Sequence, residues 1–335
     1  MKKITDYGKV FDIIVKRTKG YICSNNLKCM VLGISGGIDS TVVAAICHEV
    51  SRQTGIPLIG RSLPTTNNKT NEVSTADLVG KAFCNDYKVY PIDRFYHQFM
   101  IDIVHKETGS VRYIQNEYTG GFTIDLEDCL KFQTPIANGN IQARLRMIYL
   151  YNLASIYGGL VMDTDNLTEN NLGYFTIHGD VGDFNPIGGL WKTEVFELAK
   201  WLVDSYYSNT TVFENNKIED YIKYETKIFS QSKIDAISES LKLKPTAGLG
   251  ITNNDLEEIG AESYDQVDEV LEVILAWKMI TGPSKYSFDN FIISDFMTAL
   301  AHIPEEIIRN VAKRHFASEF KRKQLPIKIT RDEIV

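Results

Sequence analysis

The stretch VLGISGGIDST (Val31–Thr41) joins an apolar run to a helical pattern through a loop of glycines and serines. Glycines let backbone N–H groups approach an anion closely, and the N-terminus of the next helix carries partial positive charge. The loop lacks the G-x-x-x-x-G-K-[ST] pattern and contains Asp39 instead. We interpret it as a phosphate-binding loop in which Asp39 holds Mg²⁺ against phosphate oxygens. The alternative is an ordinary glycine turn with Asp39 beside a helix cap.

The pattern around this loop predicts an α/β fold. Apolar, β-branched runs indicate buried strands at 29–34, 57–63, 87–92 and 158–164. Helical patterns lie between them, at 40–53, 70–84 and 140–157. Because strands and helices alternate, we predict a doubly wound parallel sheet with helices on both faces and ligands at the carboxyl ends of its strands.

The remainder of the chain predicts an extension of this core. We expect a single domain over 1–335, made of an N-terminal helix, an α/β core and a loop with a helical extension, at 1–28, 29–206 and 207–335. Apolar residues recur at helical spacing at 264–281 and 304–323. The acidic side of the first of these helices is predicted to be a solvated face, formed by Asp265, Asp268 and Glu272.

Composition excludes several classes of protein. The 335 residues include 44% hydrophobic and 24% charged residues, which is ordinary for a globular enzyme, and the net charge of −7 argues against a general nucleic-acid binder. The five cysteines form no C-x-x-C pair, which favours reduced thiols over a zinc ribbon. There is no signal-peptide pattern, and no apolar run approaches the roughly 20 residues of a membrane helix. We expect a cytoplasmic protein without a nucleic-acid or membrane partner.

A second polar segment, MDTDNLTENNLGYFTIHGDVGDFNPIGGLWKTE (162–194), follows the fourth predicted strand. Thr164 and Glu169 come just after the strand end, where a doubly wound sheet binds ligands. Glu169 would complete a magnesium site with Asp39, and Lys192 would neutralise phosphate. Taken singly, the segment reads as a polar loop and Lys192 as a solvent-exposed lysine.

SGGIDS (35–40) resembles the pyrophosphate loop S-G-G-x-D-S of the N-type ATP pyrophosphatases, which cleave ATP between its α- and β-phosphates. Further segments resemble, in the same order, the motifs of the NAD synthetase family. They are NGNIQARLRMIYLYNLA (138–154), the 162–194 segment through Thr164, Glu169, Gly173, Thr176, Gly179-Asp180, Asn185-Pro186 and Lys192, KPTAGL (244–249), SYDQVDEVL (263–271) and SEFKRKQLP (318–326). The resemblance covers most of the chain.

The resemblance implies an adenine nucleotide α-hydrolase-like fold and a ligase reaction. In that family, nicotinic acid adenine dinucleotide (deamido-NAD) attacks the α-phosphate of ATP, pyrophosphate leaves, and ammonia converts the adenylate into NAD and AMP. The implied catalytic residues are Asp39, Glu169 and Lys192, with Mg²⁺ held by Asp39 and Glu169. The implied ATP-binding residues are Gly33, Ile34, Ser35, Gly36, Gly37, Ile38, Asp39, Ser40, Thr164, Lys192 and Thr246. The implied deamido-NAD contacts are Arg144, Asp183, Phe320 and Lys321.

Some positions depart from the family pattern or have a second interpretation. Ile177, Gly248 and Phe320 stand where the family commonly has a lysine, an acid and a histidine. These departures affect the deamido-NAD half of the site more than the ATP half. Arg144 alone is explained equally well as a helix-surface charge, and Lys321 alone as a solvated one.

The sequence favours direct use of ammonia. The chain has no room for a nitrilase-like glutaminase domain, and Cys129 has no evident Glu/Lys partner motif. Asp180 and a water chain are the two options for accepting a proton. The family implies a homodimer, and the tyrosine-rich helix at 140–157 suits an interface and core packing equally.

Two other functions stay open. One is another adenylating ligase with the same loop, similar to GMP synthetase. The other is a non-catalytic nucleotide-binding relative, although two metal-binding carboxylates are more than binding alone needs.

Overall fold

The computed structural model describes residues 3–100, 102, 113–115, 122–124, 135–208, 229–244, 255–322 and 327–334. Its main sheet has four parallel strands in the order β3-β2-β1-β6. They are β1 (Met30–Gly33), β2 (Leu58–Ser62), β3 (Asp86–Val89) and β6 (Leu160–Val161). The chain moves outward from β1 to β3 and then returns to the other side of β1. The carboxyl ends of β1 and β6 therefore border a topological switch point, as the doubly wound prediction requires.

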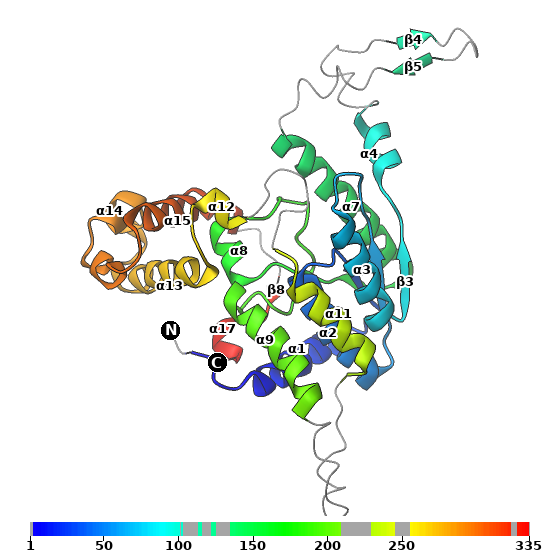
Figure 1. Ribbon diagram of the computed structural model, residues 1–335, viewed down its shortest axis with the longest axis horizontal. Helices are drawn as coiled ribbons and strands as arrows, with labels where there is room; N and C mark the ends of the chain where they lie inside the picture. Colours follow the sequence, from blue (N-terminus) through cyan, green and yellow to red (C-terminus); the bar gives the residue numbers. More distant parts are fainter. Residues whose placement is uncertain are drawn as a thin grey trace, which may run out of the picture.

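Helices cover both faces of this sheet (Figure 1). One face packs against α2 (Ile38–Thr54) and α3 (Thr70–Phe83), and the other against α7 (Pro135–Tyr157). Side chains of β1 alternate between the two cores: Met30 belongs to the first and Val31 to the second. Burial on both faces explains why β1 is a continuous apolar run, and the α/β prediction is confirmed.

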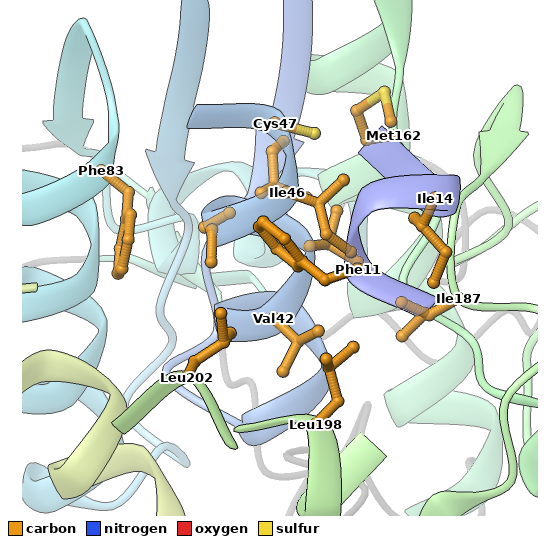
Figure 2. Packing of buried hydrophobic residues seen from close by; sticks show 14 of the residues in the cluster. Phe11, Ile14, Val42, Ile46, Cys47, Phe83, Met162, Ile187, Leu198 and Leu202 are labelled. Carbon is orange, nitrogen blue, oxygen red and sulfur yellow. The ribbon is translucent and has the colours of Figure 1, made fainter. Parts of the chain in front are cut away.

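A second layer of helices encloses α2. It consists of α1 (Tyr7–Ser24), α9 (Lys192–Ser208) and α11 (Gln231–Leu241). Figure 2 shows how side chains such as Phe11, Ile46 and Leu198 meet in this core. Each fully buried apolar side chain contributes roughly 1.5–3 kcal/mol, so α2 is held firmly on all sides. The loop at its N-terminus therefore starts from a rigid support.

The C-terminal helices form a separate lobe beside the α/β part (Figure 1). Their core also includes Leu172 and Trp191, so the lobe is packed onto the α/β part at this point. The elements are α12 (Asp255–Ile259), α13 (Tyr264–Thr281), a 3₁₀ turn (Pro283–Lys285), α14 (Phe288–Ile292), a second 3₁₀ segment (Asp295–Leu300), α15 (Glu305–Ala317) and α16 (Glu319–Arg322).

Two predictions for this lobe need correction. The helix predicted at 304–323 is interrupted at Ser318, where the cap of α15 separates it from α16. The solvated acidic face of α13 is wrong for Asp268, which is only 5% exposed, although Asp265 is exposed. The reason lies in tertiary contacts with α8 and α9, described below.

Short elements complete the fold. The antiparallel pair β4 and β5 is separate from the main sheet, and β7 pairs in parallel with β8. The bounds are α4 (Asp93–Phe99), β4 (Tyr113–Gln115), β5 (Phe122–Ile124), α8 (Leu167–Leu172), β7 (Phe184–Asn185), β8 (Ile327–Lys328) and α17 (Arg331–Ile334). Within the described ranges, no helix combines the length and apolarity needed to cross a membrane.

Candidate active site

The predicted phosphate loop connects the end of β1 to the start of α2. Gly36 has a φ of 87°, and a Cβ there would lie 2.5 Å from the carbonyl oxygen of Glu72 in α3, so only glycine fits. The Ser40 hydroxyl donates to the Gly37 carbonyl at 3.0 Å and lies 3.0 Å from the Ser35 hydroxyl. These contacts fix the loop in one shape at a helix N-terminus, where anions bind favourably.

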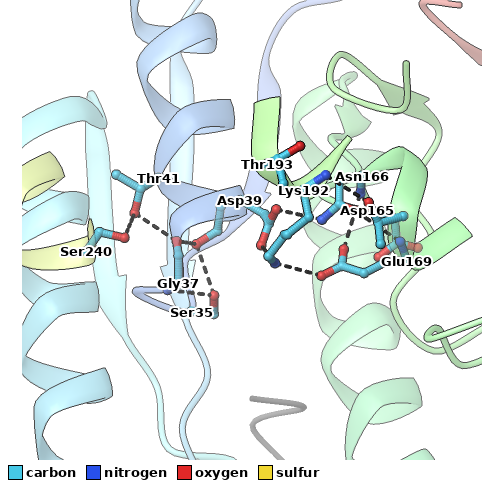
Figure 3. A network of polar contacts seen from close by, with 12 residues as sticks. Ser35, Gly37, Asp39, Thr41, Asp165, Asn166, Glu169, Lys192, Thr193 and Ser240 are labelled. Carbon is cyan, nitrogen blue, oxygen red and sulfur yellow. Dashed lines mark hydrogen bonds and ion pairs between the residues drawn. The ribbon is translucent and has the colours of Figure 1, made fainter. Parts of the chain in front are cut away.

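Asp39, Glu169 and Lys192 come together although they lie far apart in the sequence (Figure 3). The Lys192 Nζ atom lies 2.6 Å from Asp39 Oδ2 and 2.9 Å from Glu169 Oε1. Asn166 joins the two carboxylates. Its side chain donates to Asp39 Oδ1 at 2.8 Å, and its backbone N–H donates to Glu169 Oε2 at 3.2 Å. The four side chains thus form one network across α2, α8 and α9.

The charges in this network do not balance. Lys192 is only 2% exposed, so the interpretation of a solvent-exposed lysine is wrong. Burial opposes its charge, but Asp39 and Glu169 raise the pKa of Lys192 well above its ordinary value. Burial, together with the negative charge of Asp39, raises the pKa of Glu169 to about 7 despite the nearby lysine. Two carboxylates share a single ammonium group, and the site has an excess of negative charge.

A magnesium ion fits this donor set. Among the described residues, no group of three or more His, Cys, Asp or Glu side chains is arranged to hold a metal ion. Mg²⁺ commonly takes only one or two protein carboxylates and completes its shell with water and substrate phosphates. Asp39 and Glu169 supply the two carboxylates beside a phosphate loop, and a cation would relieve their excess charge.

A cleft of about 210 Å³ opens beside the network, at the carboxyl ends of β1, β2 and β6. This is the place where the topology predicts ligand binding. The cleft brings together predicted ATP-binding residues from two distant segments, namely Gly33, Ile34, Ser35 and Thr164. Further walls come from α7 and from the segment between α8 and β7, including Ala143, Arg146, Met147, Gly179 and Asp180.

Two arginines in this cleft had no predicted role: Arg61, which is buried, and Arg146, which is partly buried. Arg146 donates from Nε to the Leu63 carbonyl at 2.9 Å, and burial lowers its pKa to about 10. Arg61 is 2% exposed and forms an ion pair with Asp86 at 2.7 Å. The signal for Arg146 was the pair of arginines in ARLR (143–146), of which only Arg144 was given a predicted role.

Two acidic side chains belong to this region: Asp163, which is buried, and Asp180, which lines the cleft. Asp163 accepts hydrogen bonds from the N–H groups of Gly182 at 2.9 Å and Asp165 at 2.7 Å. Asp180 lines the cleft and accepts from the Thr176 N–H at 2.7 Å. Burial, with a contribution from Asp163, raises the pKa of Asp180 to about 7. A carboxyl group at the cleft wall with this raised pKa is a candidate proton acceptor.

The residues predicted to contact deamido-NAD do not converge on one another. Lys321 donates from Nζ to the carbonyls of Gly173 at 2.8 Å and Phe175 at 2.7 Å. Phe320, its neighbour on α16, is 59% exposed. Lys321 is thus neither a solvated charge nor, in this state, a free ligand-binding group, because it holds the backbone that follows α8.

Arg144 and Asp183 likewise contact the backbone. Arg144 is exposed on α7, and its Nε donates to the Ile177 carbonyl at 3.3 Å. Asp183 accepts from the Val161 N–H of β6 at 2.9 Å. Together with Lys321, these side chains shape the 173–183 segment. The predicted contacts of Thr246 and the departure at Gly248 lie outside the described residues, as does Cys129.

Two further polar residues of the site gave little or no sequence signal. Ser240 of α11 donates to the Gly36 carbonyl at 2.9 Å and accepts from the Thr41 hydroxyl at 3.0 Å, which supports the loop from behind. Asn166 lies within the 162–194 segment, where nothing local distinguishes it from the other polar residues. Both act through contacts that no local pattern reveals.

The fold and the site define a class: a nucleotide-binding α/β enzyme with a glycine-rich phosphate loop and a two-carboxylate centre. A family model described as NAD synthase matches residues 10–325. The chain belongs to the NAD synthase family and is an enzyme of the ligase class.

Individual relatives agree with this assignment. The chain is 30% identical over 270 residues to the NH(3)-dependent NAD(+) synthetase of Methanococcoides burtonii, covering 79% of each protein. It is 29% identical over 328 residues to that of Pyrococcus horikoshii, covering 97% of this chain and 95% of the relative.

Solved structures agree on the fold. The NMN synthetase of Francisella tularensis has a TM-score of 0.63 at 23% identity, over 95% of this chain and 97% of that one. The NH3-dependent NAD synthetase of Campylobacter jejuni has a TM-score of 0.58 at 22% identity, over 96% and 98%.

Proposed function

We propose that this enzyme amidates deamido-NAD to NAD with ammonia, through an adenylate intermediate that consumes ATP and releases AMP and pyrophosphate. The observation that carries the proposal is the Asp39–Lys192–Glu169 network beside the phosphate loop. The relatives named NH(3)-dependent NAD(+) synthetase support the choice of reaction. A carboxylate is a poor electrophile, and activation by ATP gives it a good leaving group.

The first step takes place at the phosphate loop. An oxygen of the nicotinic acid carboxylate forms a bond to the α-phosphorus while the bond from that phosphorus to the bridging oxygen breaks. Pyrophosphate leaves with the bonding electron pair. Lys192 and the backbone N–H groups of the loop would stabilise the charge that develops on the leaving group. Asp39 and Glu169 would hold Mg²⁺, which spreads that charge further when it is bound.

The second step replaces AMP by nitrogen. Ammonia adds to the carbonyl carbon of the adenylate and loses a proton, and the bond from carbon to the AMP oxygen breaks as AMP leaves with its electron pair. Asp180 is the group we assign to receive the proton, because it lines the cleft and its pKa is about 7. Arg144, Asp183, Phe320, Lys321 and Thr246 keep their predicted roles in binding the two nucleotides.

The test is a product assay with purified enzyme, ATP, Mg²⁺, ammonium and deamido-NAD. We expect NAD, AMP and pyrophosphate in equal amounts. ADP and phosphate, or AMP formation that does not depend on the acceptor, would refute the proposal. Xanthosine monophosphate tests the GMP synthetase-like alternative, and the absence of turnover with intact ATP binding would favour the non-catalytic one.

The deamidated mononucleotide belongs in the same assay, because one solved protein of this fold is named NMN synthetase. The comparison of kcat/KM for the dinucleotide and the mononucleotide decides the acceptor. We expect the dinucleotide to be preferred, in line with the names of the more similar relatives.

We also propose that the enzyme is a cytoplasmic homodimer built from a single domain. Exposed apolar side chains on α7 support dimerisation: Ile148, Ile156 and Tyr157 are 55%, 65% and 49% exposed. Light scattering on the purified enzyme tests this, with twice the chain mass of 37.9 kDa expected. A monomer at micromolar concentration would contradict it.

A further inference from the structure

A buried carboxylate of the C-terminal lobe reaches the catalytic elements. Asp268 lies in the second turn of α13, and its side chain contacts both α8 and α9. It accepts hydrogen bonds from the Thr168 hydroxyl, from the Thr193 N–H at 3.1 Å and from the Thr193 hydroxyl at 2.8 Å. Asp268 is therefore the point at which three helices are joined.

These contacts fix the first turn of α9, the helix that carries Lys192. The first N–H groups of a helix have no partner within the helix. Three N–H groups at the start of α9 have side-chain acceptors: Trp191 N–H donates to Glu194 at 3.0 Å, Lys192 N–H to the Thr168 hydroxyl at 2.8 Å, and Thr193 N–H to Asp268. The backbone of Lys192 is thus held from α8 and, through Thr168, from α13.

The same lobe also contacts the tip of Lys192. The Lys192 Nζ atom lies 5.7 Å from the ring centre of Tyr264, one turn before Asp268 on the same side of α13. Thr168 is the residue directly before Glu169 in α8. The hydrogen bonds of Asp268 therefore restrain both α8, which carries Glu169, and α9, which carries Lys192.

We propose that Asp268 is a positioning residue of the ligase: through Thr168 and Thr193 it sets the placement of Lys192 and Glu169 against the phosphate loop. The inference rests on the proposed roles of Lys192 and Glu169. It assigns a task to α13, which makes the C-terminal lobe part of the catalytic apparatus.

A purely structural role explains these observations less well. A Ser, Thr or Asn residue at the start of α9 would cap it locally and with a neutral group. Instead the cap is a carboxylate in a buried place, where burial raises the pKa of Asp268 to about 7. The arrangement is unfavourable for stability alone, but it ties the starts of two catalytic helices to one fixed point.

The test uses Asp268→Asn and the pair Thr168→Val and Thr168→Ser. Asparagine keeps the shape but halves the number of acceptor oxygens, and valine removes both hydrogen bonds of the threonine, whereas serine keeps them. We expect kcat for NAD formation to fall about tenfold in Asp268→Asn and Thr168→Val, with the KM for ATP within about twofold of wild type. Thr168→Ser should retain kcat within about threefold.

The control is Asn310→Ala. Asn310 lies on α15 of the same lobe, and its side chain donates to the Ile259 carbonyl at 2.9 Å, away from Lys192. This variant should lose stability but keep its kcat per folded molecule. The inference is overturned if folded Asp268→Asn keeps the wild-type kcat, or if its loss only follows the unfolded fraction as in Asn310→Ala. If Asp268→Asn does not fold, the valine and serine pair decides by the same criteria.

A second readout separates this inference from the proposed function. Amide hydrogen exchange at Lys192 and Thr193 reports whether the start of α9 is held, whatever the enzyme makes. We expect exchange there to be about tenfold faster in Asp268→Asn than in wild type and unchanged in Asn310→Ala. Unchanged exchange in Asp268→Asn overturns the positioning role. A wild-type enzyme that forms no NAD overturns the proposed function alone.

Discussion

The two halves of the predicted site differ in what their side chains contact. In the ATP half, Asp39, Glu169 and Lys192 bind one another, with Asn166 as a fourth member. In the deamido-NAD half, the predicted side chains bind backbone groups of the 173–183 segment and do not meet. Two carboxylates share one ammonium group in this network. A cation would balance their excess negative charge and could in turn bind phosphate oxygens. The second half instead shapes a wall of the cleft.

This difference predicts different failures. Substitutions in the ATP half should lower turnover, and those that unbalance the buried charges should also lower the free energy of unfolding. Substitutions in the other half should change the affinity for the acceptor.

The largest effect is expected from Lys192→Met. Removing the ammonium group leaves two carboxylates without a counter-charge, which should cost about 3–5 kcal/mol of unfolding free energy. Turnover should fall about 10³-fold because a stabilising charge at the leaving group is lost. Urea unfolding and NAD formation measure the two effects.

Lys200→Met is the matched control on the same helix. Its side chain is 56% exposed and pairs with Glu197, so the change in stability should stay within about 0.5 kcal/mol. Equal effects of the two substitutions would contradict the network as described.

Asp39→Asn should have the next largest effect. Asparagine keeps a hydrogen-bond acceptor near Asn166 and Lys192 but loses the charge that would bind Mg²⁺. We expect ATP to bind within a few-fold of the wild-type affinity, and turnover to fall about 10²–10³-fold. Isothermal titration with ATP and single-turnover kinetics separate the two. Wild-type turnover would exclude a metal role for Asp39.

Asp180→Asn tests the proton acceptor. The carboxyl group accepts a proton only when it is ionised, and burial raises its pKa from the ordinary 3.8 to about 7. Wild-type activity should therefore rise as the pH increases through about 7. The variant should lose the part of this rise that comes from Asp180, and its rate should be about 10²-fold below that of wild type above pH 7.

Rates should be plotted against unprotonated ammonia, so that the titration of ammonium itself does not contribute. A profile of the variant that parallels wild type would assign the proton to a water chain. The raised pKa of Asp180 also makes the stability of the folded protein depend on pH. The folded state holds the Asp180 proton more tightly than the unfolded chain, so this group makes wild type less stable as the pH rises from about 4 to 7.

The smallest effects belong to the acceptor half. Lys321→Ala removes two hydrogen bonds to the carbonyls of Gly173 and Phe175 and should raise the KM for deamido-NAD about tenfold, with little change in the KM for ATP. Phe320→Ala, at a side chain that is 59% exposed, should change either constant by no more than about threefold. Steady-state kinetics with each substrate varied measures both. A loss of kcat alone in Lys321→Ala would break the distinction between the halves.

The sequence predicted what depends on local pattern. Apolar runs and glycines predicted the strand–loop–helix order around Gly36 and the position of Thr164 at a strand end. The helical spacing of apolar residues predicted the helix at 264–281. Motif resemblance, rather than spacing, grouped Glu169 and Lys192 with Asp39, and the structure brings the three side chains together. Their roles in catalysis stay predictions.

Long-range contacts were beyond such reasoning. Asp268 has the position of a solvated acid on an amphipathic helix, and only the approach of α8 and α9 buries it. Ser240 lies 204 residues from the glycine that it supports. The helical pattern of 304–323 continues through Ser318, although α15 ends there. Each depends on a partner that tertiary packing supplies.

The most direct test of the central claim is a crystal structure with a non-hydrolysable ATP analogue and Mn²⁺ in place of Mg²⁺. The anomalous signal should place the metal at about 2.0–2.3 Å from carboxylate oxygens of both Asp39 and Glu169, with Lys192 at the phosphates that leave. A metal bound by phosphates alone, or a nucleotide outside the cleft at the ends of β1 and β6, would contradict the account.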